Sequence, residues 1–243
     1  MNKRRLITVL VIIILWQGLA LLINNDILIP LPWNVFKQML TNIVTPSFYY
    51  TVLVTIVRML KGLLVALVSA LILGVLGGIY QRIADYFSIV NDIIKTIPNI
   101  SYIIIVLIWL GSEGSVTVVT FFILFPGLYA NILLGMNSLT QDLKDVMAIY
   151  PETLFNKIKK VYLPQIVPYL LSGLKVAFGL GFKVSVMAEI LSQVRVGIGK
   201  QIYYARNMLD MTSIISWTLW IIVISLLVDY VFEKIIEHQK KDN

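Results

Sequence analysis

The chain has 243 residues, of which 58% are hydrophobic and only 14% are charged, with no cysteine and a formal net charge of +7. Ordinary soluble domains are about 45–50% apolar and about 25% charged. This composition, with a mean hydropathy of +0.86, excludes a soluble globular enzyme, a disordered chain and a disulfide-stapled secreted domain. Because one spanning helix takes about 20 apolar residues, we expect an all-α polytopic membrane protein with about six transmembrane helices. We expect a single transmembrane domain over residues 1–243, with no room for an additional soluble domain.

The first apolar run covers Leu6–Ile23 and follows a basic start. A cleaved signal peptide has the same general form, but this run is long for one and lacks a clear small-residue cleavage site, which favours an uncleaved span. Residues 33–43 are expected to form a short interfacial helix. The later spans are expected at 62–79, within a longer apolar run at 50–80, and at 87–110, 115–136, 168–190 and 212–232. The span at 87–110 contains Asp92, Lys95 and Pro98, so we expect its first half to be broken or interfacial.

Basic residues lie mainly in segments that this topology places on one side of the membrane. They come before the first span, after the last span and in the loop between the fourth and fifth spans, at Lys3, Arg4, Arg5, Lys157, Lys159, Lys160, Lys240 and Lys241. This is the positive-inside distribution, and it argues against nucleic acid as a partner. We therefore expect a multi-pass protein of the cell (inner or plasma) membrane, in contact with lipid, with both termini and the loop at 137–167 in the cytoplasm.

Small residues recur every four positions in two of the expected spans. The second span has Gly62, Ala66, Ala70, Gly74 and Gly78, and the fifth has Gly173, Ala177 and Gly181. Such stripes let helices approach closely, because van der Waals contact drives helix association in lipid. We expect these two helices to form the core, packed on each other or across a dimer.

Residue types that carry catalysis or bind metals are nearly absent. The only histidine is His238 in the polar tail, and there is no cysteine, so we expect no metal site. The sequence Gly197-Ile-Gly199-Lys200 does not match a phosphate-binding P-loop, since Gln201 stands where serine or threonine is required. We expect no catalytic residue and no cofactor on this chain. If transport uses ATP, the ATPase is another chain.

The loop at 137–167 has apolar residues at helical spacing, interleaved with charges. Val146, Ile149 and Tyr150 form one group, and Leu154 and Phe155 belong to another. This spacing predicts two short amphipathic helices joined near residue 151. Their apolar faces need either a protein partner or lipid headgroups to cover them.

This loop resembles the EAA loop of the permeases of binding-protein-dependent ABC importers. Asp145 stands for the glutamate of that pattern, Pro151 for its glycine, and Leu163-Pro164 for its closing pair. Valine and methionine replace the two alanines, and proline cannot supply the positive φ that glycine allows, so the geometry is expected to differ locally. Other segments are similar to the nitrate, sulfonate, taurine and bicarbonate branch, namely Ile97-Pro98, 108–111, Phe125-Pro126, 188–191 and 197–199.

The resemblance implies an assembly of two permease subunits, two cytoplasmic ATPase subunits that bind ATP and Mg, and an extracellular or lipid-anchored solute-binding protein. A homodimer is expected, although a heterodimer stays open. The residues implied in ATPase coupling are Asp145, Ile149, Tyr150, Pro151, Leu163 and Pro164. The solute implied is small and anionic, resembling nitrate or a sulfonate, with a vitamin precursor as an open alternative.

Two ionisable residues in the fifth span are candidates for the translocation pathway, Lys183 and Glu189. Lys183 lies about 22 Å from the inner end of that span, at 1.5 Å per residue, where a lysine signals a function or a partner. It could instead snorkel outward or pair with Glu189 across the dimer. The alternative functions are an ATP-independent secondary transporter or channel subunit, with coupling-ion sites near Asp92 and Lys95, and a membrane scaffold without a pathway. Co-purification with an ATPase and a binding protein would separate them.

Overall fold

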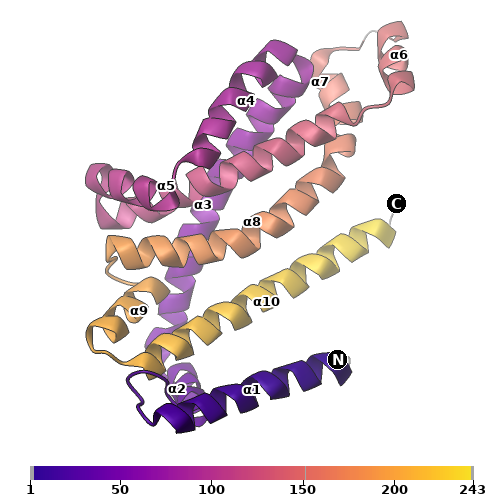
Figure 1. Ribbon diagram of the computed structural model, residues 1–243. Helices are drawn as coiled ribbons and strands as arrows, with labels where there is room; N and C mark the ends of the chain where they lie inside the picture. The colour runs from indigo at the N-terminus through magenta and orange to yellow at the C-terminus, as the bar shows by residue number, and fades with distance from the viewer. Residues whose placement is uncertain (1–2, 151, 242–243) are drawn as a thin grey trace.

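The computed structural model describes residues 3–150 and 152–241, and these fold into helices joined by short links (Figure 1). The helices are α1 (Lys3–Ile23), α2 (Pro32–Val44), α3 (Pro46–Ile79), α4 (Gln81–Thr96), α5 (Asn99–Asn137), α6 (Gln141–Ile149), α7 (Leu154–Lys157), a π-helical turn (Ile158–Tyr162), α8 (Leu163–Ser192), α9 (Ile198–Asn207) and α10 (Met211–Lys241). The expected all-α class is confirmed for this part of the chain.

Four stretches in the described residues are long and apolar enough to cross a membrane: Leu6–Ile23, Pro46–Ile79, Asn99–Asn137 and Met211–Val228. The protein is therefore a polytopic membrane protein, with fewer such helices than the six expected spans. The expected fifth span lies in α8, which has 30 residues. Lys175, Lys183 and Glu189 lie within α8 and lower its hydropathy.

The expected third span, 87–110, is divided between two helices. α4 ends at Thr96 and α5 begins after Pro98, because proline has no N–H to continue a helix and disfavours helical backbone before it. α5 then changes direction at Gly111, whose φ of 68° and ψ of −178° are not helical. The rings of Tyr102 and Phe122 stack 5.4 Å apart, whereas 20 residues of straight helix would span about 30 Å. The chain thus turns at Gly111, between the expected spans at 87–110 and 115–136, and residues 99–110 fold back on the start of the leg at 112–137.

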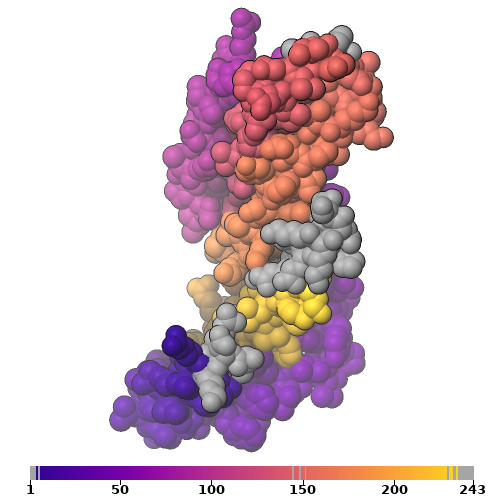
Figure 2. All heavy atoms as spheres, turned by 90° about the vertical axis from the view of Figure 1, so that its right-hand side faces the viewer, coloured from indigo at the N-terminus to yellow at the C-terminus, as the bar shows by residue number. Residues whose placement is uncertain are grey.

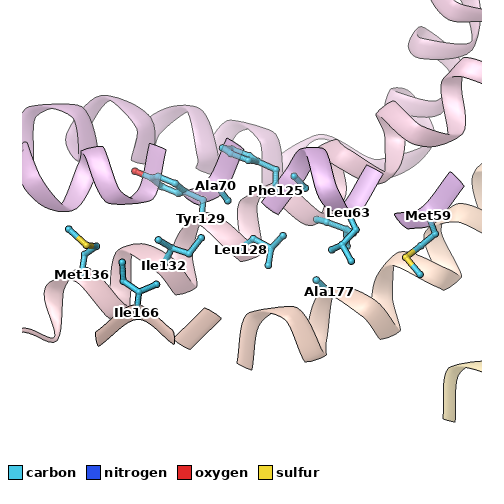
Figure 3. Close-up of a cluster of buried hydrophobic side chains, with 12 residues drawn as sticks. Met59, Leu63, Ala70, Phe125, Leu128, Tyr129, Ile132, Met136, Ile166 and Ala177 are labelled. Carbon is cyan, nitrogen blue, oxygen red and sulfur yellow. The ribbon is translucent and has the colours of Figure 1, made fainter. Parts of the chain in front are cut away.

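The hydrophobic core lies where the leg 112–137 packs between α3 and α8 (Figure 3). Leu128 and Ile132 of this leg are almost fully buried, and Leu63 of α3 and Ile166 of α8 approach them from two sides. The cluster comprises Met59, Leu63, Ala66, Ala70, Leu124, Phe125, Leu128, Tyr129, Ile132, Met136, Ile166 and Ala177.

Within the chain, both small-residue stripes face α5 rather than each other. A Cβ added at Gly62 would come within 2.7 Å of the Thr117 carbonyl oxygen, and one at Gly74 within 2.6 Å of Ile132 Cγ2. In α8, the Cβ position of Gly173 lies 3.2 Å from Asn131 Cβ. The same close packing holds for the other stripe residues: a Cβ at Gly78 would meet Met136, one at Gly181 would meet Leu124 and Met59, and Ala66, Ala70 and Ala177 are buried.

The helices connect two ends of the molecule. Both termini and the α6–α7 segment lie at one end, hereafter the α6 end, whereas α9 and the α1–α2 link lie at the opposite end, hereafter the α9 end (Figure 1). The two N-terminal helices lie far from α4 and α6, so that the molecule is long in this view (Figure 2). α1 is almost fully exposed, and the Trp16 indole nitrogen donates to the Pro30 carbonyl oxygen at 3.0 Å beside it.

Candidate functional site

The α6 helix at the α6 end is short and stabilised by local interactions. Asp142 lies in its first turn, where a negative charge complements the positive end of the helix dipole. The Gln141 side-chain amide donates to Asp145 Oδ1 at 2.9 Å. The helix ends at Ile149, and the Tyr150 N–H donates to the Val146 carbonyl at 3.0 Å. Asp145 is thus engaged within its own helix.

α7 leads directly into α8. The Thr153 side chain accepts a hydrogen bond from the Asn156 N–H and caps α7. The π-helical turn then joins α7 to α8, where Leu163 and Pro164 occupy the first turn. Pro164 has no N–H, so it donates no hydrogen bond back into the π-helical turn that precedes it. The loop expected to extend to residue 167 therefore ends earlier, and Leu163-Pro164 begins a long helix.

Five large apolar side chains lie exposed along this segment. We call Val146, Ile149, Tyr150, Leu154 and Phe155 the apolar patch; their exposed fractions range from 49% to 73%. The two helices on either side of residue 151 agree with the sequence expectation, although α7 has only four residues. Pro151 itself lies outside the described residues. Leu163 and Pro164, the other expected coupling residues, are also exposed.

An exposed ion pair stabilises the start of α7. Lys160 Nζ lies 2.9 Å from Glu152 Oε1, and the Asn156 side chain donates to the other carboxylate oxygen. The hydrogen bonds from Lys160 and Asn156, together with the Lys160 charge, hold the pKa of Glu152 below its ordinary value.

A fully buried carboxylate lies at the α9 end. Glu189 of α8 is 0% exposed. Its Oε1 accepts from Arg58 Nη1 at 2.9 Å, and its Oε2 accepts from Thr55 Oγ1 at 3.0 Å and from the Gly199 N–H at 2.9 Å. A buried charge is tolerated only when it is paired and hydrogen-bonded in this way.

Arg58 extends these contacts to the rest of that end. Its guanidinium also donates to Glu113 and to the Val196 carbonyl oxygen. Glu113 in turn accepts from the Arg195 N–H at 2.8 Å. We call Thr55, Arg58, Glu113, Glu189 and Gly199 the polar junction; it ties α3, α5, α8 and the start of α9 together.

The backbone that leads into α9 also depends on this junction. The Ile198 N–H donates to Thr55 Oγ1 at 2.9 Å. Gly197 has a φ of 146°, which side-chain-bearing residues rarely adopt. Gly197-Ile-Gly199 therefore forms a turn around a carboxylate of the same chain.

Sequence reasoning singled out Glu189 but not its partners Thr55, Arg58 and Glu113. A signal was available, because Arg58 lies just before the expected span 62–79 and Glu189 lies at the end of the expected span 168–190. The expected topology places Arg58 and Glu189 at the same depth in the membrane, where oppositely charged side chains usually pair. Within the chain, Glu189 pairs with Arg58.

Lys183 lies on an exposed face of α8. It borders a cavity of about 400 Å³ between α8, α9 and α10, together with Met187, Ile202, Thr218 and Ile221. No ion pair of Lys183 occurs among the residues that the structure describes. Lys183 and Glu189 thus occupy different surroundings.

The described residues contain no group of three or more histidine, cysteine, aspartate or glutamate side chains that could hold a metal ion. The site consists instead of an exposed apolar patch, a buried polar junction and a lysine-bearing cavity. Residues 66–239 match the family described as "Binding-protein-dependent transport system inner membrane component". The chain belongs to this family. It is a transmembrane permease of an ABC transport system and is not itself catalytic; ATP binding lies on the partner ATPase in such systems.

Similar proteins cover most of the permease. It is 28% identical to a putative ABC transporter permease protein of Methanocaldococcus jannaschii, over 89% of this chain and 83% of that protein. It is 25% identical to the nitrate import permease of Synechocystis sp., over 93% and 85%. It is 22% identical to a putative aliphatic sulfonates transport permease of Bacillus subtilis, over 90% and 80%. Membership of a binding-protein-dependent system implies an ATPase and a binding protein as partners.

Proposed function

We propose that this permease is an importer subunit that forms the translocation pathway for a small anionic solute delivered by an external binding protein. A separate ATPase subunit drives the transport, and two copies of the permease form the membrane unit. In this proposal the α6 end faces the cytoplasm and the α9 end faces outward. The positive-inside distribution of lysine and arginine supports this orientation, and both chain termini lie on the same side as α6, the right-hand side of Figure 1, although the N-terminus is far from α6.

The exposed apolar patch carries the coupling part of the proposal. Ile149, Tyr150 and Phe155 are each about 70% exposed, and they lie on a helical segment beyond the long membrane helices. A contiguous apolar surface outside the lipid core marks an interaction site. An ATPase that binds this patch could move α8 through the continuous connection from α7 to α8.

Replacing Ile149 and Tyr150 together with aspartate tests this coupling. We expect the double variant to insert and fold normally, because neither side chain is buried, but to lose the ATPase during co-purification. The matched control is Met208→Asp with Leu209→Asp, which changes two exposed apolar residues at the α9 end. An intact, ATP-hydrolysing complex with the Ile149 and Tyr150 changes would contradict the coupling role.

Lys183 carries the solute part of the proposal. A lysine at this depth costs about 2.5–3.5 kcal/mol on insertion scales unless it faces water or a partner, and it borders a cavity. An ammonium there offsets the desolvation of a crossing anion. Nitrate and aliphatic sulfonates, named for two similar permeases, are solutes of this charge.

Substituting Lys183 separates charge from packing. We expect Lys183→Met to keep expression and ATPase binding but to reduce uptake of nitrate or an alkanesulfonate in proteoliposomes, whereas Lys183→Arg keeps much of the uptake. A methionine variant that transports normally would assign Lys183 a structural or snorkelling role.

The ATP-independent alternative receives no support from the residues it requires. Asp92 and Lys95 form an exposed pair 3.7 Å apart on α4, and an exposed pair of this kind does not build a dehydrated coupling-ion site. Glu189, the second candidate for the pathway, is engaged in the polar junction. We therefore propose that Glu189 supports the pathway by holding α8 and α9 rather than by contacting the solute.

A further inference from the structure

A second cavity, of about 440 Å³, opens at the α9 end among α2, the start of α3, α9 and the start of α10. Its volume falls in the range of small-molecule sites. The walls combine aromatic rings with side-chain amides and hydroxyls, and its lining includes Asn42, Phe48, Gln201, Tyr204, Asp210 and Trp217. Unlike the Lys183 cavity, it is lined by no lysine, arginine or histidine in the part of the chain that the structure describes.

The charge of this cavity comes from one carboxylate. Asp210 Oδ1 accepts from the Ser213 N–H at 3.0 Å, so it caps α10. Capping uses one carboxylate oxygen and leaves the other oxygen for a ligand. The side chains that line the cavity offer an anion no cationic partner, whereas a cation or a neutral N–H donor meets the exposed Asp210 carboxylate.

The aromatic wall has the same preference. The Phe48 and Trp217 rings stack with centroids 5.5 Å apart, and the Tyr204 ring of α9 already carries the Lys200 ammonium, 4.3 Å from its centroid. Aromatic faces attract ammonium and amidinium groups. The Asn42 amide is held by hydrogen bonds with Ser216 and Gln38 at 2.9 and 3.2 Å, which fixes the polar wall beside the rings.

We infer that this cavity binds a positively charged nitrogen group, an ammonium or amidinium, through Asp210 and the aromatic ring of Trp217. The group belongs either to a free small molecule or to an amine-bearing lipid headgroup. The inference does not depend on which solute crosses the membrane.

Three probes of equal size and different charge test the inference: benzamidinium, benzamide and benzoate. Their dissociation constants are measured by ligand-observed NMR on the full chain in phosphatidylglycerol nanodiscs. We expect benzamidinium to bind at least about tenfold more tightly than benzoate, with benzamide between them. Benzoate binding as tight as that of benzamidinium would overturn the inference.

Asp210→Asn tests the charge without removing the cap, because asparagine caps helices as well as aspartate does. We expect it to weaken benzamidinium about fivefold, the effect of one partly exposed ion pair, and to leave benzamide unchanged. Asp26→Asn, an exposed carboxylate outside the cavity, is the control and should change neither. Equal benzamidinium binding by the Asp210 and Asp26 variants would overturn the role of Asp210.

Filling the cavity tests its location. Ser47 lines it and is exposed, so Ser47→Trp should abolish binding of all three probes without disturbing the core. Thr41→Trp, an exposed residue of α2 outside the lining, should bind as the parent does. Probe binding retained in Ser47→Trp would overturn the site. Adding phosphatidylethanolamine to the nanodiscs should weaken the probe if a lipid headgroup is the occupant, and should have no effect if a free molecule is.

Discussion

The two ends of the permease differ in how they accommodate their charged groups. At the α9 end, the Glu189 carboxylate is fully buried, and hydrogen bonds from three residues of the same chain satisfy it. At the α6 end, Ile149, Tyr150 and Phe155 are exposed, and the ion pair between Glu152 and Lys160 is exposed as well.

This contrast indicates which end is complete in one chain. A buried carboxylate without partners would be very costly, so the polar junction has to form when the chain folds. An exposed apolar patch costs little until another surface covers it, and covering it is then favourable. The polar junction at the α9 end is therefore self-sufficient within one chain, whereas we propose that a partner covers the apolar patch at the α6 end.

Removing Arg58 disrupts the polar junction and has the largest expected effect on stability. Arg58→Met leaves Glu189 buried without its cation and should lower the free energy of unfolding by about 3–5 kcal/mol. The measurement is unfolding of the purified chain in detergent. Lys61→Met, an exposed residue of the same helix, is the control and should be nearly neutral.

A double variant sharpens this result. Arg58→Met with Glu189→Met removes both charges and should be more stable than Arg58→Met alone, since no unpaired charge then stays buried. If Arg58→Met, Glu189→Met and the double variant all had the same free energy of unfolding as Lys61→Met, the junction would contribute nothing to stability.

Overpacking the interface between α3 and α5 should have a smaller effect on stability than removing Arg58. Gly74→Leu places side-chain atoms where Ile132 lies, 2.6 Å from the Cβ position, and should cost about 1–3 kcal/mol by overpacking. Gly127→Leu is the matched control, because nothing lies within 4 Å of its Cβ position. Equal thermal stability of the two variants in detergent would show that the stripe tolerates a side chain.

The exposed ion pair at the α6 end should show the smallest effect. NMR titration of labelled Glu152 should give a pKa below the ordinary carboxyl value, and Lys160→Met should raise it. A lowered pKa means that the pairing is fully present above the ordinary value and is lost as the pH falls through the lowered one. Lys159→Met, with no recorded ion pair among the described residues, should leave the Glu152 pKa unchanged.

Much of the candidate site could be read from local sequence patterns. The periodicity of Val146, Ile149 and Tyr150 predicted a short amphipathic helix, and α6 is that helix. Pro98 predicted a break in the third expected span, and the break occurs there because proline ends helical hydrogen bonding. The composition predicted a helical membrane protein. Each of these features depends on residues close together in the chain.

Other features depended on contacts that no local pattern specifies. The glycine stripes of α3 and α8 predicted close packing of these two helices on each other or across a dimer, whereas within the chain α5 lies between them (Figure 3). Arg58 and Glu189 are 131 residues apart along the chain, so their pairing required the fold of all the helices between α3 and α8.

The sequence by itself thus determined the class of the protein, the positions of most helices and the exposed apolar patch. These follow from hydropathy, helical periodicity and proline chemistry, which act over a few residues. Only the tertiary structure decided which helix fills the space between the stripes and which cation satisfies Glu189. Close helix packing and a buried ion pair each require two surfaces to come together. Local sequence patterns describe each surface but not which other surface it contacts.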